Sequence, residues 1–376
     1  MAFLTLARFY TLNEGFFAFN IKYLFLVGLW PEDGLTKNER IIYNIYEILI
    51  YISTIIFLII TGIGTYNCRN DLTRFFSNLD MILVAYNFFL KANIFLFKID
   101  KLKTLIEEIE SSGDVVTEKS KKLMSAPVFI ITGLSLIIVG SFSALAIFKG
   151  EMTIEAWMPF DPLKNRMSLI LSAQILAILI LPGLFRAFAM QGIVCSIVVY
   201  LCDQLISVQA AIKNLKYTKE TEKETRKKFR DIIRKHIRLM RYSRTMEAIF
   251  KEYFLVQNLA VTLELCLNAV MVTVVRDFTI LSFLAYLGLA LVNAYIYSYL
   301  GNELMLQSRG IVLAAYETPW TSWPLDMQKD LLILIIAAQK PFALSAGGVA
   351  LVSLETFGKT LYDGYSIFAV LNDMVD

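Results

Sequence analysis

The chain has 376 residues, of which 57% are hydrophobic, and its mean hydropathy is +0.58. Soluble domains contain about 45–50% apolar residues, so this composition excludes an ordinary soluble protein. The formal net charge of +3 is too small to indicate a nucleic-acid-binding surface. Charged residues make up only 18% and are clustered, and the stretches between clusters are long enough to cross a bilayer, which takes about 20 helical residues.

Seven apolar stretches qualify as transmembrane helices. They lie at residues 41–65, 72–97, 127–148, 168–206, 249–275, 279–303 and 349–374. The first 20 residues lack the pattern of a cleaved signal peptide, so we expect the first span to direct insertion. The predicted units are an N-terminal segment (1–40), spans one to four (41–206), a helical extension (207–248), spans five and six (249–303), an anchor segment (304–348) and the last span (349–376).

The distribution of Lys and Arg predicts the orientation of the spans. The N-terminal segment and every second loop after it carry 26 of these residues, whereas the alternate loops carry five. By the positive-inside rule, the N-terminus is expected in the cytoplasm and the C-terminus outside the cell. This orientation is opposite to that of a G-protein-coupled receptor.

Two segments are expected to form helices outside the membrane, on the cytoplasmic side. After Pro182-Gly183, residues 184–245 are almost free of Gly and Pro, and apolar residues recur at helical spacing through the basic stretch from Lys213 to Arg244, so the fourth helix is expected to extend well into the cytoplasm. A short helix is predicted over 325–339, stopped by Pro341. These cytoplasmic helices fit an assembly region, while a solvated basic face near anionic lipid explains the stretch equally well.

The last span carries its polar residues on one helical face. Glu355, Lys359, Asp363, Ser366 and Asp373 are spaced by four, four, three and seven residues, and Val370 falls on the same face. Lipid cannot accommodate this stripe, so it lines a pore or cavity or is buried against a neighbouring helix with internal pairing such as Glu355 with Lys359. Val370 and Met374 are one turn apart and could form an apolar gate, with Asp373 attracting cations at the mouth.

The stretch from Tyr295 to Asp373 resembles the C-terminal region of insect odorant receptors. The matching pieces are Tyr297-Ser298-Tyr299-x-Gly301-Asn302-Glu303-Leu304, Ala315-Tyr316-Glu317-x-x-Trp320, Gln339-Lys340-Pro341, Ser353-Leu354-Glu355-Thr356-Phe357 and Tyr365-Ser366-x-Phe368-Ala369-Val370-Leu371, and Trp157-x-Pro159-Phe160-Asp161 resembles a family feature in the second outer loop. The chain lacks the long inner-loop insertion of the co-receptor subunit and the Gln-Phe ending of gustatory receptors. It is therefore similar to a tuning subunit.

The resemblance implies an all-α membrane protein of seven transmembrane helices whose cytoplasmic extensions form an anchor. It implies a ligand-gated, non-selective cation channel in the plasma membrane of olfactory neuron dendrites, built as a heterotetramer with co-receptor subunits. Ser366, Val370, Asp373 and Met374 of the last helix would line its pore. The implied partners are the co-receptor, a small volatile organic ligand, membrane lipid and permeating cations. A gustatory receptor, a G-protein-coupled receptor and a transporter are the alternatives.

An odorant site is expected to be an apolar pocket in the outer half of the helices. The candidate residues at helical spacing on spans two to five are Phe76, Leu79, Asp80, Leu83, Phe142, Leu145, Ala146, Leu171, Gln174, Ile175, Leu267, Val270 and Met271. Asp80 and Gln174 stand out because polar groups at this depth usually have a partner or a role. Plain helix packing remains the alternative for each residue.

Other polar residues are expected to have no part in ligand binding. Lys91 and Arg186 are expected to snorkel to the inner interface, and Glu264 to pair with a neighbouring helix. His236, the single histidine, is predicted at the surface. Because no nucleophile motif, phosphate-binding loop or metal-ligand spacing is present, we expect no enzyme activity, cofactor or metal.

Overall fold

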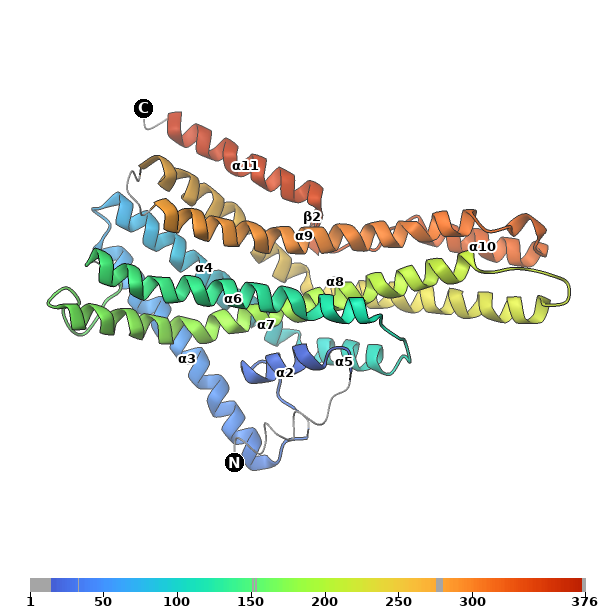
Figure 1. The fold of residues 1–376 in the computed structure, drawn as a ribbon, viewed down its shortest axis with the longest axis horizontal. Helices are drawn as coiled ribbons and strands as arrows, with labels where there is room; N and C mark the ends of the chain where they lie inside the picture. Colours follow the sequence, from blue (N-terminus) through green and yellow to red (C-terminus); the bar gives the residue numbers. More distant parts are fainter. Residues whose placement is uncertain (1–14, 33, 151, 153, 275–279, 374–376) are drawn as a thin grey trace.

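The fold is an elongated bundle of helices, seen in a computed structural model that describes residues 15–373 except 33, 151, 153 and 275–279 (Figure 1). The helices are α2 (Ala18–Leu26), α3 (Lys37–Asn67), α4 (Leu72–Phe97), α5 (Ile99–Glu110), α6 (Glu118–Lys149), α7 (Arg166–Lys213), α8 (Glu222–Val274), α9 (Ile280–Tyr316), α10 (Leu325–Ala338) and α11 (Leu354–Asp373), with a 3-10 turn at Trp320–Ser322. Strands β1 (Ser345–Ala346) and β2 (Ala350–Leu351) pair antiparallel, with Ser345 opposite Leu351.

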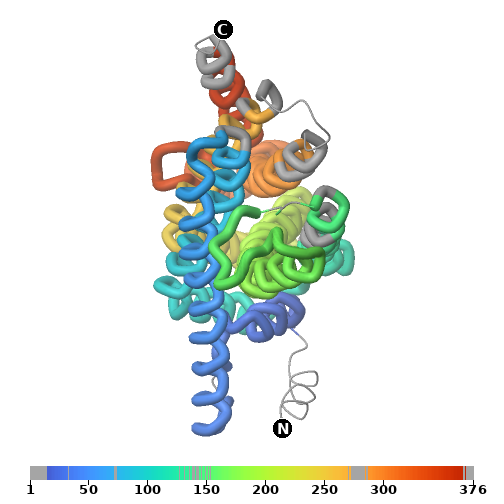
Figure 2. Tube along the Cα trace, turned by 90° about the vertical axis from the view of Figure 1, so that its left-hand side faces the viewer, coloured from blue at the N-terminus to red at the C-terminus, as the bar shows by residue number. Residues whose placement is uncertain are grey.

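The bundle has two ends that differ in their connections. The turn at 68–71 and the α6–α7 connection at 150–165 form one end, called here the loop end. The opposite end, called the α10 end, carries α10 and the turn at 214–221 between α7 and α8 (Figure 1). Seen along the bundle, α3 and α11 project on opposite sides of it (Figure 2).

Side-chain caps set where several helices begin. Thr36 and Glu39 form a capping box at the start of α3, Asp71 accepts from the Arg74 amide at the start of α4, and Asn165 accepts from the Ser168 amide at the start of α7. By length and hydropathy alone, three described helical segments are able to cross a membrane: Lys37–Asn67, Arg74–Phe97 and Arg166–Lys213. The all-α architecture predicted from the sequence is confirmed.

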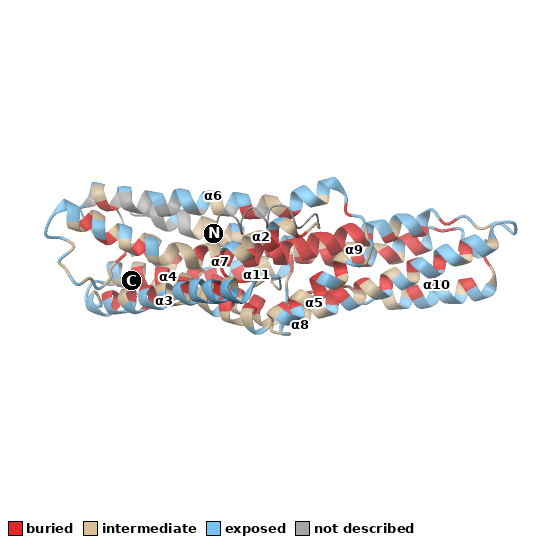
Figure 3. Ribbon diagram, turned by 90° about the horizontal axis from the view of Figure 1, so that it is seen from below, coloured by how far each residue is buried: buried red, intermediate tan, exposed pale blue. Residues whose placement is uncertain are grey.

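The core is centred on the second half of α7. Every residue from Arg186 to Leu205 is buried, because α6, α8 and α9 pack around this stretch. Figure 3 shows the buried residues gathered in the middle of the bundle. A helix that is buried on all sides is apolar all round, which is why this segment shows no amphipathic pattern in the sequence.

The basic cytoplasmic stretch belongs to a different helix from the one expected. The fourth predicted helix does not run through it: α7 ends at Lys213, and a turn held by the Thr218 and Thr221 hydroxyls, 2.7 Å apart, reverses the chain. The basic stretch then forms the first half of α8 and runs on into the fifth span without a break. The turn contains neither Gly nor Pro, so no signal in the sequence predicted it.

Three polar residues expected at an interface or surface are buried instead. The Lys91 ammonium group donates to Gln257 Oε1 at 2.5 Å, and Arg186 donates to the backbone carbonyls of Val27 and Gly28 at 3.0 and 3.2 Å. The prediction that Lys91 and Arg186 snorkel to the membrane interface is therefore wrong. Both side chains stay buried because neighbouring segments provide hydrogen-bond acceptors for them. His236 is also buried, because its ring stacks on the ring of Phe342, with the ring centres 5.7 Å apart. Phe342 reaches this position because the chain folds back after α10.

Candidate functional site

A small apolar hollow lies between α4, α6, α7 and the α6–α7 connection, towards the loop end. Its lining is almost entirely apolar and consists of Met81, Ala146, Met152, Ile154, Leu169, Ser172, Ala173, Leu176, Ala177 and Ile180. The single hydroxyl, on Ser172, already donates to the Leu169 carbonyl at 2.8 Å. The hollow therefore suits a small apolar molecule that brings few hydrogen-bonding groups.

The α6–α7 connection is fixed across this hollow by specific backbone contacts. The Asn78 side chain donates to the Glu155 carbonyl at 2.8 Å and accepts from the Glu155 amide at 2.9 Å. The Trp157 amide donates to the Ile60 carbonyl at 2.8 Å. A Cβ atom on Gly64 would stand 2.2 Å from the Glu155 carbonyl oxygen, so only glycine lets the connection approach α3 this closely. These contacts hold Met152 and Ile154 over the hollow.

The candidate ligand residues from the sequence occupy several environments. Ala146 lines the hollow, and Phe76 packs against the buried Met271. Leu171 and Gln174 are exposed on the other side of α7. Asp80 is buried, and Leu79, Leu83, Ile175 and Leu267 are partly buried. The side chains of Phe142, Leu145 and Val270 lie outside the described part of the chain.

The sequence interpretation chose a different face of α7 from the one that lines the hollow. The lining face carries Leu169, Ser172, Ala173, Leu176, Ala177 and Ile180, at spacings of one, three and four residues. Its small residues were an available signal, because alanine and serine leave space between helices where leucine fills it. Met152 and Ile154 carried no such signal, since their position depends on the fold of the connection.

A chain of buried polar groups runs along the contact between α4 and α8. The Asn268 side chain donates to Asp80 Oδ1 at 3.1 Å, so Asp80 has the partner expected for a polar group at this depth. One turn away on α8, the buried Glu264 carboxylate interacts electrostatically with both Asp80 and Lys91. Lys91 in turn bonds Gln257, as described above. We call these five residues the α4–α8 polar chain.

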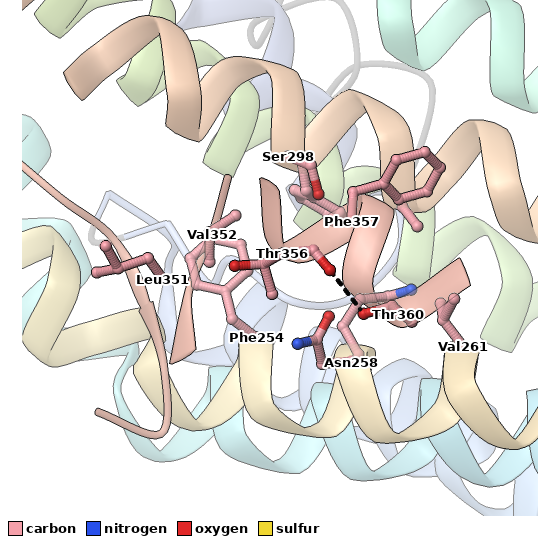
Figure 4. A pocket seen from close by; sticks show the side chains of 12 residues that line it. Phe254, Asn258, Val261, Ser298, Leu351, Val352, Thr356, Phe357 and Thr360 are labelled. Carbon is pink, nitrogen blue, oxygen red and sulfur yellow. Dashed lines mark hydrogen bonds between the residues drawn. The ribbon is translucent and has the colours of Figure 1, made fainter. Parts of the chain in front are cut away.

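The polar chain reaches a second, small cavity beneath α11. Gln257 lines this cavity together with Thr356 and Thr360 of α11, and Figure 4 shows Thr360 hydrogen-bonded to the Thr356 carbonyl. The Lys91 ammonium also lies 4.6 Å from the centre of the Tyr253 ring, whose hydroxyl is 2.8 Å from that of Tyr297. The α4–α8 polar chain thus ends at a cavity that also borders the start of α11.

The polar stripe predicted on the last span faces away from the rest of the chain as far as it is described. Glu355, Lys359 and Asp363 are exposed, whereas Thr360 and Gly364 on the opposite face are buried. Ser366 is partly buried and donates to the Tyr362 carbonyl. The side chains of Val370 and Asp373, and the whole of Met374, lie outside the described residues.

Glycine in the Gly301-Asn302-Glu303 motif allows α9 to approach the segment that leads into α11. A Cβ atom on Gly301 would stand 2.2 Å from the Val352 carbonyl oxygen. Ser353 follows directly and caps α11 by accepting from the Thr356 amide at 3.2 Å. Two of the sequence pieces that carry the family resemblance, 297–304 and 353–357, therefore meet at one junction, which positions α11.

Several charged residues towards the α10 end form ion pairs or hydrogen bonds with each other. Asp114 accepts from Tyr200 at 2.7 Å and from Arg238 at 2.8 Å. Burial opposes ionisation of Asp114, but the Tyr200 hydrogen bond and the charges of Lys235 and Arg238 outweigh it and hold the pKa of Asp114 below its ordinary value. Arg226 bonds both Glu222 and Asp326. Among the described residues, no group of three or more His, Cys, Asp or Glu side chains is arranged to hold a metal ion.

Comparisons with known proteins give consistent matches. The sequence profile of the family described as 7tm odorant receptor matches residues 71–362. The chain is 29% identical over 179 residues to odorant receptor 49a of Drosophila melanogaster, covering 47% of this chain and 43% of that protein. It is 38% identical over 88 residues to odorant receptor 30a of the same species, covering 23% of each. The matched region thus spans less than half the length of these curated relatives.

The fold is also similar to that of a solved receptor. The insect olfactory receptor OR5 from Machilis hrabei superposes with a TM-score of 0.80 at 16% identity, covering 94% of this chain and 96% of that one. The same receptor in complex with eugenol gives a TM-score of 0.77 at 17% identity, covering 94% and 97%. At this identity the match shows the fold alone: a bundle of seven transmembrane helices.

Proposed function

The chain belongs to the insect odorant receptor family, and on this basis we propose that it is the odorant-binding tuning subunit of a heteromeric, ligand-gated cation channel. Membership in the family supports an odorant-binding receptor in a multi-pass membrane setting. The channel activity, the co-receptor and the plasma membrane of the olfactory dendrite are parts of the proposal. Because the chain belongs to this family, we reject the alternatives of a gustatory receptor, a G-protein-coupled receptor and a transporter.

The apolar hollow towards the loop end is the observation that carries the ligand proposal. It is lined by apolar side chains and one satisfied hydroxyl, which matches the chemistry of small volatile organic molecules. The positive-inside pattern favours an orientation with the loop end outside the cell, from which odorants arrive. The fold shared with a receptor solved in complex with eugenol supports a ligand of this class.

The α4–α8 polar chain supports a route from this region to α11. Asp80 lies one residue from Met81 of the hollow, and Gln257 lines the cavity that touches α11. Buried polar groups have discrete hydrogen-bonded arrangements, so a ligand that shifts α4 can change the contacts made by Gln257. The exposed stripe of Glu355, Lys359 and Asp363 on α11 supports a pore-lining role for this helix.

The ligand site is tested by filling the hollow. Ala177→Phe places a ring in it, whereas Ile178→Phe changes the neighbouring residue, which is 66% exposed on the other side of α7. In cells that express the chain with the co-receptor, Ala177→Phe is expected to lower odorant potency by about 10–200-fold, and the control by much less. Unchanged potency with Ala177→Phe, at normal surface expression, would place the ligand elsewhere.

The subunit and pore proposals need separate measurements. We expect odorant currents only when the chain is expressed together with the co-receptor, and strong currents from the chain alone would contradict the tuning-subunit assignment. Cysteine substitutions from 363 to 374 should be modified on the face of Ser366, Val370 and Asp373. Uniform protection of that face would show that it is buried against protein.

A further inference from the structure

A groove at the side of the bundle combines positive charge with apolar surface. It is an open groove between α5 and α8, lined by Lys101, Ile237, Met240, Arg241, Arg244, Thr245 and Ala248. Three of these side chains are cationic, and the lining contains no carboxylate. Such a surface fits an anion that also carries apolar atoms.

The cations of the groove are only partly neutralised by the protein. Arg241 forms an ion pair with Glu108 at 2.7 Å, just outside the lining. Lys101 and Arg244 have no ion pair with any residue in the described part of the chain. This differs from nearby Arg238 and Lys235, which converge on Asp114. Two positive charges of the groove are therefore available to a ligand.

The position of the groove along α8 relates it to the membrane surface. The neighbouring pair Lys98 and Glu252, 3.9 Å apart, marks the level at which α4 leaves its apolar span, and Phe97 beside it is 86% exposed. At about 1.5 Å per residue, Ala248 lies ~6 Å and Arg244 ~12 Å beyond Glu252 towards the α10 end. The headgroup layer is about 5–8 Å thick on each side of the hydrocarbon core. Arg244 thus lies just past this layer.

We propose that this groove binds an anionic phospholipid whose phosphates project beyond the headgroup layer, as those of a polyphosphorylated inositol lipid do. The acyl chains would lie along the apolar span above Phe97, and the projecting phosphates would reach Arg244 and Lys101. A lipid with a short anionic headgroup matches less well, because its charge ends nearer to Ala248. The proposal stands on the membrane level of the groove and does not depend on the odorant response.

The experiment measures lipid retention by the full chain, purified with the co-receptor, in nanodiscs of phosphatidylcholine with or without a phosphatidylinositol bisphosphate. Native mass spectrometry or a fluorescent analogue of that lipid gives the affinity. The test variant is Lys101→Gln/Arg244→Gln. The matched control, Lys227→Gln/Arg230→Gln, removes the same charge from exposed residues of α8 farther from the membrane. Each charge near an anionic surface contributes about fivefold, so the test variant should lose roughly 25-fold in affinity and the control far less.

Four outcomes would overturn the proposal. Equal loss in both variants would show a diffuse electrostatic attraction. Equal binding of the soluble inositol phosphate headgroup or of inorganic phosphate would show a site for free anions. Loss of co-receptor assembly without any lipid dependence would show a protein interface. If the test variant fails to fold, photocrosslinking of a phosphoinositide probe to the unmodified protein decides, and labelling outside residues 237–248 and α5 would count against the groove.

Discussion

The two halves of α7 are similar in composition but differ in their surroundings. From Arg186 to Leu205 every residue is buried, whereas the half from Arg166 to Phe185 includes Leu171 and Ile178, which are 52% and 66% exposed. The apolar hollow lies against this first half. Apolar residues therefore serve a packed protein core in one half and a lipid- or ligand-facing surface in the other. A ligand pocket needs the loosely packed half, because a close-packed interior has no space for a molecule.

The largest effect is expected for the charge buried in the α4–α8 polar chain. Lys91→Met removes the cation that faces Gln257 and attracts the buried Glu264, and leaves the acidic groups of the polar chain uncompensated. Breaking a buried pair costs about 3–5 kcal/mol of folding free energy. Unfolding of the purified protein in mixed micelles provides the measurement.

The control for this change lies directly after the end of the same helix. Lys98→Met removes a partly exposed partner of Glu252, and such surface pairs contribute about 0–1 kcal/mol. Adding Glu264→Gln to Lys91→Met should recover part of the loss. If both lysine variants unfold alike, Lys91 is not compensating buried charge.

Leucine truncations test the comparison between the halves directly. Leu201→Ala removes a side chain that is 0% exposed in the packed half and should cost about 2–3 kcal/mol of folding free energy. This is the low end for core leucines, because lipid does not drive burial as water does. Leu176→Ala enlarges an existing hollow and should cost less than half of that. Equal losses of unfolding free energy would mean that the halves are packed alike.

A glycine substitution tests the junction between α9 and the segment that leads into α11. Gly301→Ala brings a methyl group onto the Val352 carbonyl and should cost about 1–3 kcal/mol as overpacking. Gly288→Ala on the same helix meets nothing within 4 Å, so it should be neutral or slightly stabilising. Melting temperatures of the two variants, with channel leak as a second readout, check this. A stable Gly301→Ala variant would contradict such a close approach.

The smallest effect concerns pH. Burial lowers the pKa of His236 below its ordinary value of 6.5, so the unfolded chain binds a proton below pH 6.5 that the folded chain resists. Stability is therefore complete above pH 6.5 and falls as the pH drops below it, by at most about 1.4 kcal/mol per pH unit. His236→Phe, which preserves the ring against Phe342, should flatten this dependence in melting curves between pH 7.5 and 5.5. An unchanged slope would assign the acid sensitivity to other groups.

The helical periodicity of the sequence predicted only part of the candidate site. It pointed to spans two to five, of which spans two, three and four line the observed hollow, and to Ala146 among the lining residues; no described residue of span five lines it. It did not select the face of α7, because leucine and isoleucine occur on every side of a helix that contacts both lipid and protein. It also left out Met152 and Ile154, whose position depends on the hydrogen bonds between Asn78 and Glu155, 77 residues away.

The sequence by itself determined the membrane setting, the all-α class and the family, because these follow from apolar length and from motifs read along the chain. Tertiary structure alone decided which buried polar groups find hydrogen-bond partners. Lys91 and Arg186 are at depths where snorkelling was expected, yet each is buried against acceptors from other segments. His236 is covered by Phe342, which follows it by more than 100 residues. Partners so distant in the sequence meet only after the helices pack, and no local pattern records their contact.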